Sequence, residues 1–168
     1  AATFLRARMW DPASGVLLRR FREGQAGIDA YAEDYACLIF GLLELFQADP
    51  SPDWLTWAVT LQERQNELFW DEADGGWFST TGKDSSVLVR MKEDYDGAEP
   101  TASSVSVLNL LTLSHLSEEH SAEWSAMVEK TLSLFAQRLE QAGRGVPMMA
   151  AALSAYTAGP QQIVVIGE

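Results

Sequence analysis

The sequence predicts an all-α fold in which antiparallel helical hairpins pack in two layers. Helices that are apolar on most sides alternate with helices that are apolar on one face, and a helix apolar all round must be enclosed. A weak repeat of about sixty residues accompanies this alternation, because Trp10-Asp11 with Gly15 recurs as Trp70-Asp71 with Gly75. We therefore expect the enclosed helices to form an inner ring and the amphipathic helices an outer ring.

Three helices are predicted in the first half of the chain. Residues 1–9 have the pattern of a helix end, and an extended segment at 16–21 and a glycine-containing loop to Ala30 follow. Residues 31–47 predict an enclosed helix, because only Glu44 is charged between positions 35 and 46. Two prolines near position 51 end this helix, and residues 53–69 predict an amphipathic one.

The second half begins with a long loop that contains a predicted β-hairpin at 77–90, with its turn at 82–84. Pro100 then begins an enclosed helix that runs to Leu116, since proline is favoured in the first helical turn. An amphipathic helix at 121–141 and a third enclosed helix from Pro147 to Tyr156 follow. Residues expected in the core include Phe69, Leu108, Leu111, Leu132 and Phe135.

The last residues have a different pattern. Gly159-Pro160 ends the last helix, and the β-branched run Ile163-Val164-Val165-Ile166 predicts a C-terminal strand. Residues 1–159 are therefore predicted to be one helical unit, and 160–168 a strand that leads into a missing segment. The chain lacks an initiator Met and starts in what reads as the middle of a helix, so we expect it to be a fragment.

Composition excludes several functions. The net charge of -12 argues against nucleic-acid binding, which needs clustered Lys and Arg, and equally against an anionic membrane. No apolar run approaches the roughly 20 residues that span a bilayer, and no signal peptide is visible, so the fragment is expected to be soluble. Cys37 is the single cysteine, so no disulfide forms within the chain. The sequence shows no metal-ligand cluster, phosphate-binding glycine loop or Ser-His-Asp set, and we expect no cofactor.

Paired carboxylates stand at the start of two enclosed helices. Asp96 and Glu99 precede the helix that begins at Pro100, and Glu33 and Asp34 occupy the equivalent positions one repeat earlier. Helix N-termini stabilise anionic groups, and two carboxyl groups that converge there can act as an acid/base pair. The alternative interpretation is structural, because acidic residues at these positions also cap helices and anchor loops.

An ordered set of motifs resembles the family of spermatogenesis-associated protein 20 over essentially the whole chain. The motifs are Glu33-Asp34-Tyr35-Ala36, Leu68-Phe69-Trp70-Asp71, Gly75-Gly76-Trp77-Phe78, Asp96-Gly97-Ala98-Glu99-Pro100 and Gly159-Pro160-Gln161-Gln162-Ile163-Val164-Val165-Ile166-Gly167. Members of this family join a thioredoxin-like domain to a barrel of the six-hairpin glycosidase type. The resemblance implies that this chain is the later part of that barrel, a partial α/α toroid without the thioredoxin-like domain.

The resemblance leaves two functions open. As part of a carbohydrate-active enzyme, the chain would use Asp96, Glu99, Glu33 and Asp34 for catalysis, while Tyr31, Trp77 and Tyr95 would stack on sugar rings. Sugar epimerases on similar barrels use histidines, but His115 and His120 lie at the opposite end of the predicted helices. As a non-catalytic binding or scaffolding module, the chain would serve the thioredoxin-like domain. In either case the missing barrel helices would leave apolar surface exposed or covered by self-association.

Overall fold

The structure is a computed structural model that describes residues 1–83 and 87–159. Six α-helices, a short 3₁₀ helix and a three-stranded sheet form in these ranges. In chain order they are α1 (Ala2–Arg8), β1 (Trp10–Asp11), β2 (Val16–Arg22), β3 (Gln25–Asp29), α2 (Ala32–Ala48), α3 (Pro52–Phe69), α4 (Ala102–Leu116), α5 (Ser121–Ala142), η1 (Gly143–Gly145) and α6 (Pro147–Ala158).

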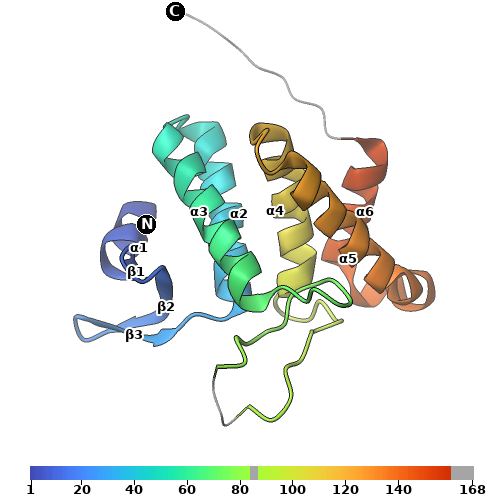
Figure 1. Cartoon of the computed structure of the whole chain (residues 1–168), viewed down its shortest axis with the longest axis horizontal. Coiled ribbons are helices and arrows are strands. Elements are labelled where there is room, and N and C mark those ends of the chain that lie inside the picture. The colour runs from blue at the N-terminus through green and yellow to red at the C-terminus, as the bar shows by residue number, and fades with distance from the viewer. Residues whose placement is uncertain (84–86, 160–168) are drawn as a thin grey trace, which may run out of the picture.

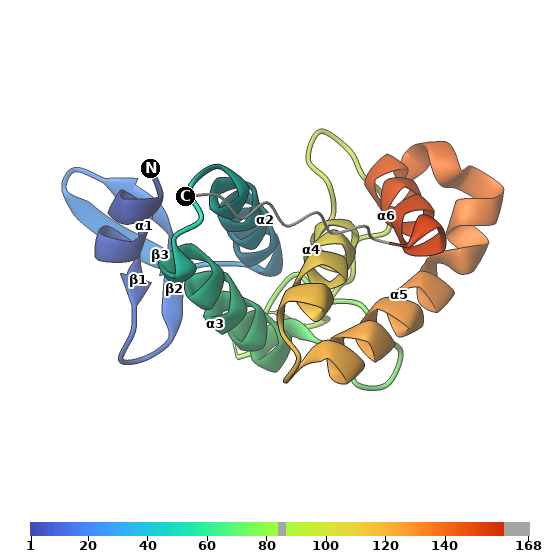
Figure 2. The same ribbon diagram turned by 90° about the horizontal axis from the view of Figure 1, so that it is seen from above.

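The helices pack in two layers. Seen from above, α2, α4 and α6 stand side by side, and α3 and α5 lie along one side of this row (Figure 2). Each outer helix packs on its sequence neighbour, α3 on α2 and α5 on α4, while α4 contacts both α2 and α6. The predicted packing of helical hairpins in two layers is confirmed. The prediction that the third apolar helix is enclosed is wrong for α6, in which only Met149 and Ala152 are buried.

The core lies between the two layers. Fully buried side chains come from each of the five long helices, namely Tyr35, Ile39 and Leu42 of α2, Trp57, Leu61 and Phe69 of α3, Leu110 and Leu113 of α4, Trp124 and Val128 of α5, and Met149 and Ala152 of α6. Of the predicted core residues, Phe69, Leu111, Leu132 and Phe135 are buried. Leu108 is only partly buried and packs against the edge of the core, so the prediction that Leu108 is a core residue was wrong.

Helix α4 is buried along most of its length, and several of its polar groups have partners inside the protein, although Asn109 Oδ1 has none in the described residues. Gln65 of α3 donates to the Ser106 hydroxyl at 2.9 Å and to the carbonyl of Ala32 at 2.9 Å. Asn109 donates to the carbonyl of Ala36 at 2.9 Å. Buried polar groups require such partners, and these bonds fix α4 against α2 and α3.

Two predictions about β structure need correction. The β-hairpin predicted at 77–90 is wrong, because residues 77–83 and 87–90 form no strand. In these two segments, Trp77 makes an isolated bridge to Trp70. The hairpin forms instead between β2 and β3, with Glu23 (φ 53°) and Gly24 (φ 82°) at its turn. Two successive positive φ angles match the twist of a tight hairpin. The predicted strand at 163–166 lies outside the described residues.

Candidate functional site

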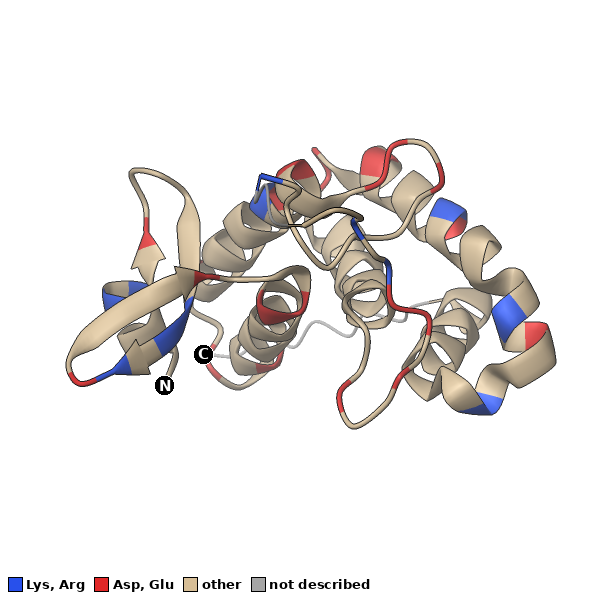
Figure 3. Cartoon of the chain, turned by 90° about the horizontal axis from the view of Figure 1, so that it is seen from below, with Lys and Arg blue, Asp and Glu red and all other residues tan. Residues whose placement is uncertain are grey.

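The helices α2, α4 and α6 all begin at the same end of the molecule, where the long loop between α3 and α4 also lies (Figure 1). Acidic residues occur at the start of α2 and along this loop when that end is viewed directly (Figure 3). All seven predicted site residues belong to these helix starts or to this loop. The repeat positions therefore share one end of the fold, as the sequence predicted.

Glu33 and Asp34 lie in the first turn of α2 beside Arg19 of β2. Asp34 Oδ2 accepts the backbone amide of Tyr31 at 2.8 Å, which caps the helix, and lies 3.2 Å from Arg19 Nε. Glu33 Oε1 lies 4.0 Å from Arg19 Nη2, which is the longest distance that counts as an ion pair. Burial is the main cause that raises the pKa of Glu33, and the neighbouring Asp34 charge adds to it. Glu33 is thus the carboxyl group best suited to hold a proton.

Glu99 is exposed in the loop before α4 and makes no hydrogen bond or ion pair with any residue that the structure describes. Its charge acts on Cys37, which lies one turn after Glu33 on α2. Partial enclosure of the thiol raises the pKa of Cys37, and the negative charges of Asp34, Glu99 and Glu33 raise it further. Carboxylates from both helix starts therefore act on the exposed Cys37 side chain.

Both carboxylate oxygens of Asp96 accept hydrogen bonds from backbone amides. Its Oδ1 accepts the amide of Thr101 at 2.8 Å, and its Oδ2 accepts the amides of Met148 at 2.8 Å and Met149 at 3.4 Å. Its own amide donates to the carbonyl of Gly145 at 2.8 Å. Asp96 is buried and joins the starts of α4 and α6, so the structural interpretation holds for this carboxylate.

The three aromatic candidates differ in exposure. Trp77 is 1% exposed, and its indole donates to Asn66 Oδ1 at 3.1 Å, so it belongs to the core and leaves no ring face for a sugar. Tyr31 is 38% exposed, with the Arg19 guanidinium 4.2 Å from its ring centre. Tyr95 is 59% exposed, and its ring edge lies against Gly97 and Gly145, where a Cβ atom would approach it to 3.2 Å.

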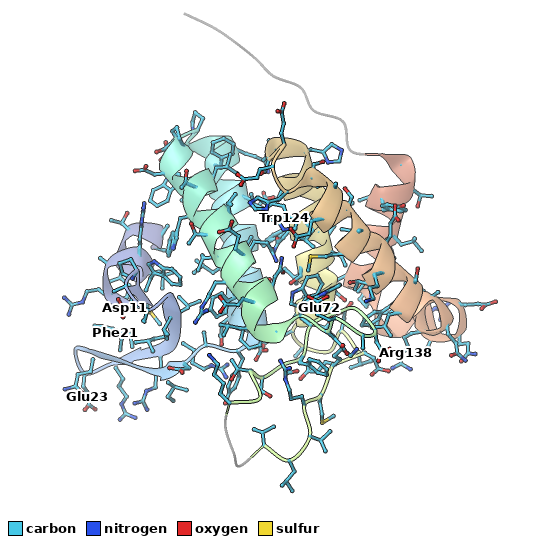
Figure 4. The ribbon with its side chains drawn as sticks, viewed as in Figure 1. Asp11, Phe21, Glu23, Glu72, Trp124 and Arg138 are labelled. Atoms are coloured by element: carbon cyan, nitrogen blue, oxygen red, sulfur yellow. The ribbon has the colours of Figure 1, made fainter. Side chains whose placement is uncertain are left out.

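Sequence reasoning missed a groove of about 490 Å³ between α3 and α5. Trp124 lies between these helices and Glu72 near the lower end of α3 (Figure 4). His120 stacks on Trp124 with ring centres 4.4 Å apart, and its Nε2 lies 3.1 Å from Glu63 Oε1. The His120 side chain is 19% exposed. Residues three or four positions apart share one face of a helix, and this spacing could have indicated the wall of the groove. The residues so spaced are Glu63, Asn66 and Glu67 of α3 and Trp70, which follows it.

In residues 1–83 and 87–159, no cluster of three or more His, Cys, Asp or Glu side chains has the arrangement of a metal site. None of the helices in this described part combines the length and apolar character that a bilayer crossing requires.

No family model matches the chain. Curated relatives do: it is 39% identical to human spermatogenesis-associated protein 20 and 38% identical to the rat protein, each over 99% of its own length. An uncharacterised protein of Caenorhabditis elegans is 35% identical over 87% of the chain. The chain spans only 22% of the length of the human and rat relatives. Over the part of those relatives that it matches, the chain belongs to the family of spermatogenesis-associated protein 20.

Proposed function

We propose that residues 1–159 form part of an α/α toroid of the six-hairpin glycosidase type that binds or processes a carbohydrate. The parallel row of α2, α4 and α6, backed by α3 and α5, supports this architecture, because a toroid continues such a row around an axis (Figure 2). The name of the human, rat and mouse relatives further supports a role in a protein associated with spermatogenesis.

The observation that carries the proposal is that Glu33 and Glu99 stand at the starts of neighbouring inner helices and that the charges of both act on Cys37. Glycoside cleavage needs one carboxyl group that holds a proton and a second that is ionised, on either side of the scissile bond. Burial raises the pKa of Glu33, which suits the acid, and Glu99 is exposed at the start of the neighbouring inner helix, which suits the base or nucleophile. Tyr31 and Tyr95 offer exposed rings for a sugar. Asp34 and Asp96 position the two helix starts.

A scaffolding function is the second candidate, and the structural use of two predicted site residues favours it. Both carboxylate oxygens of Asp96 are occupied by backbone amides, and Trp77 is enclosed in the core. In this function the same end of the molecule would contact a thioredoxin-like domain and the remaining barrel helices, without chemistry of its own.

A glycan-binding screen on this chain and on the full-length protein separates the two functions. Glu33→Gln and Glu99→Gln are nearly isosteric, and Asp94→Asn in the same exposed loop is the matched control. A carbohydrate site predicts glycan binding or turnover that both Gln variants reduce at least tenfold while the control retains it. Absence of glycan binding in both forms, with retained binding to a separately produced thioredoxin-like domain, would support the scaffold and reject the carbohydrate site.

A further inference from the structure

A cavity of about 400 Å³ lies between the small sheet, the start of α2, helix α3 and the loop that follows α3. Its volume is in the range of small-molecule pockets. Apolar side chains from the sheet and from α3, including Leu17, Ile28 and Leu68, form part of its wall. Tyr31 borders it, but neither Glu33 nor Glu99 does.

Tyr35 brings a buried hydroxyl to this cavity. The side chain is 1% exposed, and its oxygen accepts the amide of Leu17 at 3.1 Å. Its own proton meets no acceptor among the residues that the structure describes. Burial raises the pKa of Tyr35, against the opposing effects of the Leu17 amide and the Arg64 charge, so the hydroxyl stays protonated and can donate.

Thr80 and Arg64 add two more donors. The Thr80 hydroxyl is buried and has no hydrogen-bond partner in the part of the chain that the structure describes. Arg64 is partly exposed and uses Nε for the carbonyl of Gly15 and Nη1 for Glu67, while Nη2 makes no hydrogen bond within residues 1–83 and 87–159. Leaving a buried polar group without a partner is unfavourable, and this applies in full to Thr80. A bound acceptor would pair the Thr80 hydroxyl and could also accept from Tyr35 and Arg64.

Two cationic side chains line the cavity, Arg64 and Lys83; Arg64 is also paired with Glu67, and the acidic residue in the lining, Asp29, is exposed. The net charge of -12 opposes anion binding, but charges beyond about 8 Å are largely screened at physiological ionic strength. We propose that this cavity binds a small molecule through a carboxylate or phosphate group that accepts hydrogen bonds from Tyr35, Thr80 and Arg64. The proposal does not depend on the carbohydrate function, although Tyr31 borders both sites.

Calorimetric titration of the 168-residue chain tests the site, with benzoate and phenyl phosphate as anionic probes and benzyl alcohol as the neutral probe, because none of them is a sugar. Sodium chloride keeps the ionic strength constant. We expect saturable binding of at least one anionic probe and none of benzyl alcohol. Binding of benzoate alone identifies a carboxylate site, binding of phenyl phosphate alone a phosphate site, and each supports the proposal. Benzyl alcohol binding as tight as that of the anions, or no saturable binding, would overturn it.

Thr80→Val is the decisive variant, because the Thr80 hydroxyl has no partner among the described residues, so its loss should leave the melting temperature of the free chain nearly unchanged. A hydrogen bond to a charged group predicts about tenfold or more weaker binding in this variant. Thr112→Val is the control, since Thr112 is exposed on α4 and bonds only locally to Leu108. Tyr35→Phe should weaken binding as well. Equal affinity of the wild type and Thr80→Val for the anion would mean that the Thr80 hydroxyl binds a buried water and does not contact the ligand, which would reject the proposed contact.

Discussion

The carboxylate of Asp96 reaches the amide of Met148, fifty-two positions later, at 2.8 Å. Its other oxygen accepts the amide of Thr101, so one side chain caps α4 and α6 at once. The amides of a first helical turn have no partner inside their own helix. Asp96 therefore ties two inner helices together at the end where the candidate site lies.

Asp96→Ala should destabilise the chain by about 2–4 kcal/mol, because it removes two helix caps of roughly 1–2 kcal/mol each. Urea denaturation of wild type and variant measures the difference. Asp94→Asn, two residues earlier and exposed, should cost less than about 0.5 kcal/mol. Equal stabilities for the wild type and Asp96→Ala would show that the two caps contribute nothing.

Leu110→Ala should cost about 2–5 kcal/mol, the usual range for truncation of a buried leucine. Leu110 is 0% exposed, whereas Leu108 is partly buried at the edge of the core. Leu108→Ala should therefore cost clearly less than Leu110→Ala in the same denaturation experiment. A larger loss for Leu108 would reverse the assignment of the buried face of α4.

Glu99→Gln should leave the melting temperature within a few degrees of wild type, because Glu99 is exposed and unpaired in the described part of the chain. Differential scanning calorimetry checks this. A large fall in melting temperature would mean that Glu99 anchors the loop before α4, and any loss of binding in this variant would then reflect folding.

Glu33 should make stability depend on pH. A carboxyl group with a raised folded-state pKa binds its proton more tightly in the folded chain, so its contribution is present below the ordinary value of 4.5 and is lost as pH rises through the folded pKa. Glu33→Gln should therefore gain stability relative to wild type between pH 4 and pH 7. Melting temperatures at both pH values test this, and a constant difference between the two proteins would contradict it.

Exposed apolar side chains should make the chain bind a hydrophobic dye or self-associate. Leu88, Val89 and Met91 in the long loop are 94%, 74% and 67% exposed, and Phe40 of α2 is 39% exposed. Such clusters usually mark an interaction surface. Leu88→Asn with Val89→Asn should reduce dye fluorescence or the sedimentation coefficient. If the wild type is a monomer and does not bind the dye, these residues form no apolar interaction surface.

The boundaries of the helices could be predicted because the signals are local. Apolar spacing, Pro52 and Pro147 in first turns, and Gly159 at the end of α6 act within a few residues of each other. The start of α4 was misplaced by about two residues, a usual boundary error, because Thr101 and not Pro100 provides the local cap, with its hydroxyl accepting the amide of Ser104 at 3.1 Å. The hairpin at 77–90 was predicted wrongly, since alternating residues favour a strand only where a partner strand is available.

The sequence by itself determined the alternation of helix types, the placement of Glu33 and Glu99 at equivalent helix starts, and the family. Tertiary structure decided what the side chains do there. Asp96 is an anchor because Met148 is brought to it, Trp77 is core because Asn66 and Ser103 enclose it, and Tyr35 lines a cavity whose other donors lie on α3 and the loop after it. Periodicity and capping depend on neighbours within a turn or two, whereas burial and hydrogen-bond partners depend on segments that meet only when the layers pack.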